Sequence, residues 1–199
     1  MATKRTSAAE LMATLATDEK HRAIVDEKES LRSTKEAELA EDEANLVSDC
    51  ESVGIEIKSV WDLVNSSASY APAIPVLVRH LGMNHLPRTV EGIVRALTTD
   101  EARSAFEALA NLFIATRDGA SEMKWLLGAA IAETASSETA NRVIELIHNE
   151  SNGRGRAFLP LALLRLPKSE AIAQLRKLPT SADIDENVTK AIRLASVGL

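Results

Sequence analysis

Cysteine and aromatic residues are scarce in this chain of 199 residues, and their scarcity excludes several classes of protein. The single cysteine, Cys50, excludes an intramolecular disulfide framework, and one thiol is typical of a reducing cytoplasm. Aromatic residues make up only 3% of the chain, so aliphatic residues must form the core. That composition favours helices over sheets, and alternating strand patterns of useful length are absent. The sequence therefore predicts an all-α cytoplasmic protein.

Long apolar runs and catalytic motifs are also missing. No apolar run approaches the roughly 18 residues that a transmembrane helix needs, and no signal-peptide pattern follows the first basic residues, so we expect no membrane partner. The chain lacks a phosphate-binding Gly-rich loop with Lys-Ser/Thr, a Gly-x-Ser-x-Gly motif, a His-Glu-x-x-His motif and paired Cys-x-x-Cys motifs. We therefore expect no enzyme, no catalytic residue and no cofactor.

The histidines and the cysteine do not form a metal or nucleophile pattern. His80 and His85 lie five residues apart with no clear third ligand nearby, whereas a metal site needs three or four converging ligands. We interpret them as surface or capping histidines and predict no metal. Cys50 lies between Asp49 and Glu51, whose charges should raise the thiol pKa and leave it unreactive.

The net negative charge of the chain lies in its first quarter. Residues 1–52 contain 13 acids and 7 bases, whereas residues 53–199 contain 16 of each. In the neutral part Arg outnumbers Lys by 11 to 5, which leaves room for a local basic patch. An acidic segment joined to a neutral body favours a protein partner over a nucleic acid.

Residues 1–53 are predicted to form a helical extension. A capping-box spacing at Ser7 predicts a short helix over 7–16, and the absence of Gly and Pro predicts one long helix from about residue 18 to 53, ended by Gly54. Its thin apolar seam recurs every seven or eight residues, at Ile24, Leu31, Leu39 and Leu46. The long helix can cap the following repeats, or it can protrude and pair with a partner helix.

Residues 54–199 are predicted to form a repeat domain of about four helix pairs. Short amphipathic helices alternate with Gly, Pro and Ser turns, and leucine anchors recur at Leu77, Leu109, Leu146 and Leu175. Their spacings are 32, 37 and 29 residues. One pair cannot bury its apolar face alone, whereas stacked pairs form an α-solenoid with a concave surface. An irregular helical bundle is the alternative.

Residues 155–175 look much like one unit of HEAT-like helical repeat proteins. Within that class the chain resembles a group of uncharacterised bacterial HEAT-like proteins, and residues 59–65, 70–77 and 87–97 carry this resemblance. The Ala- and Glu-rich leader fits as well, so the resemblance covers nearly the whole chain. The resemblance implies a HEAT-like α-solenoid. It implies no particular activity, because no reaction is established for that group.

The predicted helix over residues 88–98 carries the most suggestive charged group. Arg88, Glu91 and Arg95 share one face at spacings of three and four, and His80 lies near the end of the preceding helix. Gly92 costs roughly 1 kcal/mol relative to Ala inside a helix, which suggests a close approach by a backbone or ligand. We predict a partner-binding stripe formed by these four charged or polar residues. An ion-pair ladder within the helix is the alternative interpretation.

Residues 149–155 form the most loop-like stretch of the chain. Arg154 and Arg156 flank Gly155 at the end of this stretch, and turn amides with Arg can bind an anion, so we predict an anion site there; a solvated loop is the alternative. Upstream, the predicted helix from residue 121 carries Trp125 among its apolar residues.

The function predicted from these patterns is a non-enzymatic protein-interaction module, acting as a scaffold, regulator or inhibitor. Nucleic-acid backbone binding in a concave groove, in the manner of DNA repair, is the alternative, but a sequence pI near 5.3 disfavours it. A small-molecule enzyme, such as a tetrapyrrole lyase, finds support only in analogy of fold.

Overall fold

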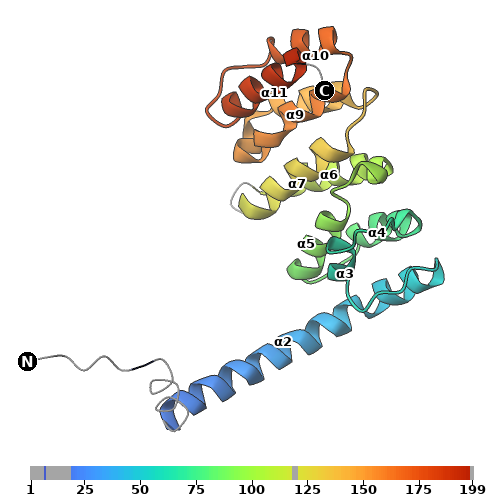
Figure 1. Cartoon of the computed structure of the whole chain (residues 1–199), viewed down its shortest axis with the longest axis vertical. Helices are drawn as coiled ribbons and strands as arrows, with labels where there is room; N and C mark the ends of the chain where they lie inside the picture. Colours follow the sequence, from blue (N-terminus) through green and yellow to red (C-terminus); the bar gives the residue numbers. More distant parts are fainter. Residues whose placement is uncertain (1–6, 8–18, 118–120, 198–199) are drawn as a thin grey trace, which may run out of the picture. The chain divides into compact units, whose positions relative to one another are not determined.

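A computed structural model describes Ser7, residues 19–117 and residues 121–197, and no strand occurs among them (Figure 1). The all-α prediction is confirmed. The helix predicted over residues 7–16 lies outside the described residues, apart from Ser7. In chain order the α-helices are α2 (Glu19–Ser52), α3 (Val60–Val64), α4 (Ile74–Leu81), α5 (Pro87–Ala96), α6 (Phe106–Ala115), α7 (Ser121–Thr134), α8 (Ala140–His148), α9 (Leu159–Ala162), α10 (Lys168–Leu175) and α11 (Asp185–Val197). Shorter 3-10 segments are η1 (Ala71–Ala73), η2 (Asp100–Ala105), η3 (Glu150–Phe158) and η4 (Leu163–Arg165).

The chain divides into two compact units, residues 1–42 and residues 43–199, and the division falls inside α2. In the first unit, the described part of α2 has mostly exposed side chains, and Leu31 is 55% exposed. In the second unit, Glu43, Leu46 and Cys50 of α2 are buried. The domain boundary predicted at residue 53 coincides with the end of α2 and stays a prediction.

The ends of α2 and α3 follow from local sequence. Gly54, two residues after the end of α2, has a φ of +83°, which a residue with a side chain rarely adopts. Ser59 caps α3, and its side chain and that of Asp62 form a capping box. The Glu43 carboxylate accepts a hydrogen bond from the Val60 amide at 3.1 Å, which joins the last turns of α2 to the start of α3.

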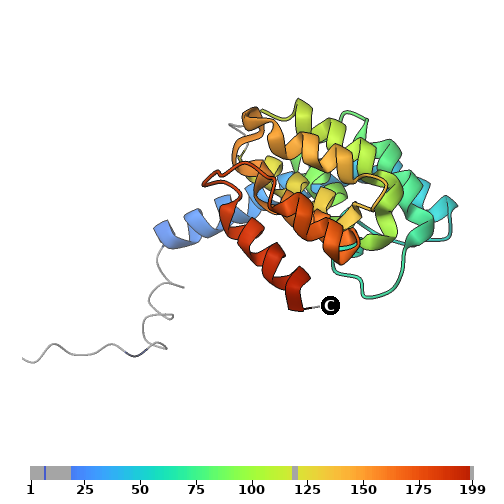
Figure 2. The ribbon, with the colours of Figure 1, turned by 90° about the horizontal axis from the view of Figure 1, so that it is seen from above.

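Within residues 43–199 the helices form two rows. The odd row consists of α3, α5, α7, α9 and α11, each of which packs against the next. The even row consists of α4, α6, α8 and α10, and each of these packs against the odd-row helix that follows it in the chain. In Figure 1 α5 and α7 lie on one side of this unit and α4 and α6 on the other. Figure 2 shows α10 and α11 side by side at its C-terminal end.

One apolar core runs between the two rows. The predicted anchors Leu77, Leu109, Leu146 and Leu175 fall on α4, α6, α8 and α10 and are all buried, so the repeated leucines mark the even row. Tyr70 connects the segment before η1 to the end of α5, because its hydroxyl donates a hydrogen bond to the Ala96 carbonyl at 2.7 Å.

One local prediction was wrong. Residues 149–155 were expected to form a loop, but residues 150–155 lie in η3, and the Asn149 side chain caps this segment by accepting the Ser151 amide. Gly153, with a φ of +49°, forms a kink inside η3. Thr99 caps η2, because its hydroxyl accepts the Glu101 amide.

None of the helices in the described part of the chain combines the length and the apolar character that crossing a membrane requires.

Candidate functional site

The predicted Arg88–Glu91–Arg95 group lies on the solvent-facing side of α5. On the opposite side of the helix, Ile93 and Val94 are fully buried. Arg88 is 57% exposed at its side chain, and Arg95 is exposed as well. Two charged side chains therefore project from a helix whose other face is fixed in the core.

Glu91 lies between the two arginines and accepts a hydrogen bond from each. Arg88 Nη1 donates to Oε2 at 3.0 Å, and Arg95 Nε donates to Oε1 at 2.9 Å. Desolvation raises the pKa of Glu91, but the hydrogen bonds from Arg95 and Arg88 and their charges outweigh it and lower the pKa below its ordinary value. This geometry is the ion-pair ladder of the alternative interpretation, and it leaves one net positive charge on the face.

Trp61 of α3 completes this group. The Arg88 guanidinium carbon lies 3.6 Å from the centroid of the Trp61 ring, a cation–π stack that joins α5 to α3. The close approach that Gly92 suggested is also made here, because a Cβ at Gly92 would collide with Val60 and lie 3.2 Å from Trp61 Nε1. We call Trp61, Arg88, Glu91 and Arg95 the α5 surface.

His80 does not belong to the α5 surface. Its side chain is only 1% exposed, so the prediction of a surface histidine in the partner-binding stripe is corrected. Its Nε2 lies 2.8 Å from Asp49 Oδ2, and its Nδ1 lies 3.0 Å from His85 Nε2. Asp49 Oδ2 also accepts a hydrogen bond from Arg79 Nη2 at 2.6 Å. The physical reason for the correction is that α4 turns His80 toward α2, where its polar atoms have partners.

Arg156 does not fit the predicted anion site either. Its side chain is 3% exposed, and it donates to the carbonyl oxygens of Ile147 and Gly153. Its Nη2 lies 3.2 Å from the Asp183 carboxylate. The guanidinium therefore joins α8 and η3 to the segment before α11, while Arg154 is exposed. An internal carboxylate occupies the position that an external anion would take.

Trp125 of α7 is a surface residue that the sequence did not single out. It was grouped with the apolar residues of its helix, yet it is 47% exposed. Its ring packs edge-on against Phe158 of η3, with the ring centroids 4.8 Å apart. Because α7 packs against α5, a second ordered aromatic group lies on the odd row.

Groups of three or more potential metal-ligating side chains do not occur among the residues that the structure describes. Cys50 is fully buried, and burial, followed by the charge of Asp49, raises the pKa of its thiol to about 11. The thiol is therefore protonated at neutral pH and is a poor nucleophile.

Comparisons with protein-family models, with curated proteins and with solved structures found no match to this chain.

Proposed function

We propose that residues 54–199 form a HEAT-like α-solenoid. The support is the pairing of elements: odd-row helices pack in chain order, and each even-row helix packs on its odd-row successor. Each helix pair then buries its apolar face mainly against its neighbours, as stacked repeats do. The spacing of the four leucine anchors, one on each even-row helix, agrees with this arrangement.

We further propose that the protein is a non-enzymatic module that binds another protein through the odd row. The observation that carries this proposal is the α5 surface, where an exposed arginine is stacked on a tryptophan and held by a carboxylate. Tryptophan and arginine are the residues that most often dominate the binding energy of protein interfaces.

The α5 surface is ordered before any partner binds. The stack on Trp61 and the hydrogen bond to Glu91 restrict the rotamers of Arg88. Ordering a long side chain on association costs roughly 0.5–1.5 kcal/mol, and this cost is reduced when the free protein already holds the side chain in place. Trp125, packed on Phe158, offers a second anchor of the same kind on α7.

The distribution of arginine charge favours a protein partner over a nucleic acid. Binding a phosphate backbone needs a stripe of basic charge that carboxylates do not neutralise. In the part of the chain that the structure describes, arginines on several elements form ion pairs with a carboxylate: Arg32, Arg79, Arg88, Arg95, Arg142, Arg156 and Arg165. Ion pairs of this kind fit a protein partner, because the surface of a protein also carries charges of both signs.

The experiment compares proteins captured from a native lysate by immobilised wild-type protein and by matched variants. Arg95→Glu and Trp125→Ala should each reduce recovery of the specific partner at least tenfold. The control is Arg142→Glu on α8, because Arg142 is also a partly exposed arginine paired with a nearby glutamate. We expect the control to retain the partner.

Melting temperature separates binding from folding. Exposed ion pairs contribute less than about 1 kcal/mol, so Arg95→Glu and Arg142→Glu should melt within a few degrees of the wild type. Equal recovery of the partner by the wild type and the three variants would refute the proposed surface. A large fall in melting temperature for Arg95→Glu would show that Arg95 stabilises the fold instead of binding a partner.

A further inference from the structure

Arg88 and Arg95 keep hydrogen-bond donors that the protein itself does not use. Each guanidinium group has five N–H donors in one plane. Arg88 donates to Glu91 through Nη1 and Arg95 donates through Nε, and neither arginine forms another hydrogen bond with a residue that the structure describes. The edge formed by Nε and Nη2 of Arg88 and the edge formed by Nη1 and Nη2 of Arg95 therefore stay open.

An open edge of this kind matches a carboxylate. Two parallel N–H donors bind the two oxygens of a planar carboxylate in a bidentate pair, which is stronger and more directional than a hydrogen bond between neutral groups. Glu91 already binds both arginines in this chain, because its two oxygens lie 3.0 Å from Arg88 Nη1 and 2.9 Å from Arg95 Nε. The α5 surface thus holds one carboxylate of its own and keeps donors for two more.

The charge of the α5 surface favours the same kind of ligand. Two guanidinium groups face one carboxylate, so the surface carries one net positive charge. The side chains of Arg88 and Arg95 are 57% and 43% exposed, whereas that of Glu91 is 28% exposed. An approaching partner therefore meets the positive charge first, and a negative segment is attracted to it.

The two open edges lie close together. Because the guanidinium groups of Arg88 and Arg95 bond to the same carboxylate, a partner reaches both edges only with acidic side chains that are near neighbours. Side chains four residues apart on a helix, or two residues apart on an extended strand, meet this condition. A single acidic side chain would leave one edge unused.

We propose that the α5 surface binds an acidic segment of its protein partner, with neighbouring carboxylates paired to Arg88 and Arg95. The contact between Arg88 and the Trp61 ring, 3.6 Å from the guanidinium carbon to the centroid, holds one of the two edges in place before binding. Nucleic-acid phosphates carry the same sign of charge, but a phosphate backbone needs a longer basic stripe, and Glu91 interrupts this one. This inference rests on the proposed docking function and adds the chemistry of the partner.

The test is an NMR titration of the full-length protein, labelled with nitrogen-15, with end-capped hexaglutamate. The Nε–H signals of Arg88 and Arg95 and the indole signal of Trp61 should shift, and added salt should weaken the shifts. The Arg142 signal on α8 is the internal control and should stay in place, because Arg142 and Glu145 form a pair with no net charge. End-capped hexalysine should leave all four signals unchanged.

Glu91→Gln separates docking from an ion-pair ladder that serves stability alone. The substitution removes the carboxylate charge, so the net charge of the α5 surface rises from one to two. Hexaglutamate should then bind roughly three- to fivefold more tightly, the effect of one added unit charge near contact distance in water. The matched control is Glu145→Gln on α8, which should leave the affinity at the α5 surface unchanged. A stability ladder predicts a lower melting temperature for Glu91→Gln without tighter binding.

Three results would overturn the acidic partner. Hexaglutamate could leave the Arg88 and Arg95 signals in place, it could move the Arg142 signal equally, or Glu91→Gln could fail to tighten its binding. An oligothymidylate that moves the α5 signals at a lower concentration than hexaglutamate would assign the surface to nucleic acid instead.

The capture experiment tests the docking function separately. Partner capture that depends on Arg95, together with unmoved signals in hexaglutamate, would remove only the acidic partner. Equal capture by every variant would remove the docking function itself.

Discussion

At the scale of single residues, the same side-chain type takes different roles according to its surroundings. Arg88 is exposed and stacked on an indole, whereas Arg156 is buried among carbonyl oxygens and a carboxylate. His80 is buried with a partner at each ring nitrogen. Sequence reasoning found these residues but could not assign the roles, because the partners of Arg156 and His80 lie up to 31 residues away.

Gly92 is required by the packing of α5 on α3. We expect Gly92→Ala to destabilise the protein by about 1–3 kcal/mol, because the new methyl group collides with the buried Val60 side chain and this outweighs the gain in helix propensity. Gly82→Ala is the matched control, since its nearest neighbour would be the Arg79 carbonyl at 3.5 Å. Thermal melts should show a lower melting temperature for Gly92→Ala alone; equal melting temperatures would contradict the packing described.

Arg156 holds η3 in place. Replacing it with Gln should cost about 2–4 kcal/mol, because two carbonyl oxygens and the Asp183 carboxylate lose a donor. Arg154→Gln, in the same segment but exposed, should lie within about 0.5 kcal/mol of the wild type. Urea denaturation measures the unfolding free energy of both variants. A larger loss for Arg154→Gln than for Arg156→Gln would contradict the role given to Arg156.

Asp49 should make stability depend on pH in acid. Its pKa is lowered in the folded state, mainly by the hydrogen bond from His80, so the unfolded chain binds the proton more readily. The contribution of Asp49 is therefore fully present above the unfolded pKa, near 3.8, and is lost as the pH falls through the lower folded pKa. Urea denaturation at several pH values in this window should show that the unfolding free energy of Asp49→Asn depends less steeply on pH than that of the wild type. An equally steep dependence would argue against the hydrogen bonds from His80 and Arg79 to Asp49.

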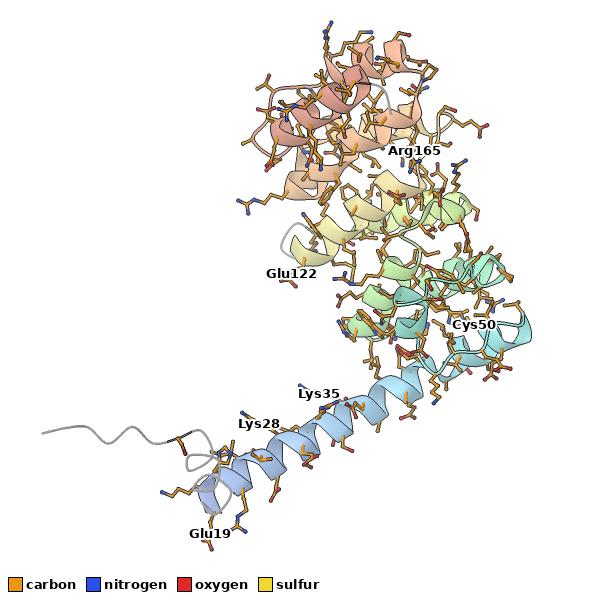
Figure 3. All side chains as sticks on the ribbon, in the orientation of Figure 1. Glu19, Lys28, Lys35, Cys50, Glu122 and Arg165 are labelled. Atoms are coloured by element: carbon orange, nitrogen blue, oxygen red, sulfur yellow. The ribbon has the colours of Figure 1, made fainter. Side chains whose placement is uncertain are left out.

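At the scale of elements, α2 combines two environments in one continuous helix. The sequence predicted a single seam through Ile24, Leu31, Leu39 and Leu46, but their burial differs: Ile24 and Leu31 are exposed, and Leu46 is fully buried. Lys28 and Lys35 point to the same side of α2, as Figure 3 shows. A spacing of seven residues is about two helical turns, which places both lysines on one face of the helix.

The two parts of α2 should respond differently to truncation of a leucine. Leu46→Ala should destabilise the fold by about 2–5 kcal/mol, because it opens a cavity in the core of the second unit. Leu31→Ala should cost less than about 0.5 kcal/mol, because the side chain is exposed. Equal losses in denaturant unfolding would mean that Leu31 is buried as Leu46 is.

The elements that the sequence predicted well depend on local signals. The end of α2 before Gly54 requires only neighbouring residues. The functional features depend on contacts between distant segments, such as Asp49 with His80 and Trp125 with Phe158. No spacing rule connects residues 31 or 33 positions apart, so these pairs could not be predicted from the sequence.

At the scale of the whole molecule, we propose that the second unit is a stack of helix pairs whose odd row binds another protein. The α5 surface and Trp125 supply anchors on two packed helices, α5 and α7. A partner that uses both would bury aromatic area and satisfy arginine donors together, the combination that favours specific association.

Photocrosslinking from defined positions tests this central claim most directly. The photoreactive residue p-benzoylphenylalanine replaces Arg95 on α5, Trp125 on α7, or Arg142 on α8 as the control, and each purified protein is irradiated in native lysate. The account predicts that positions 95 and 125 yield an adduct with the same protein and that position 142 yields none. Adducts with nucleic acid, or equal adducts from all three positions, would contradict it.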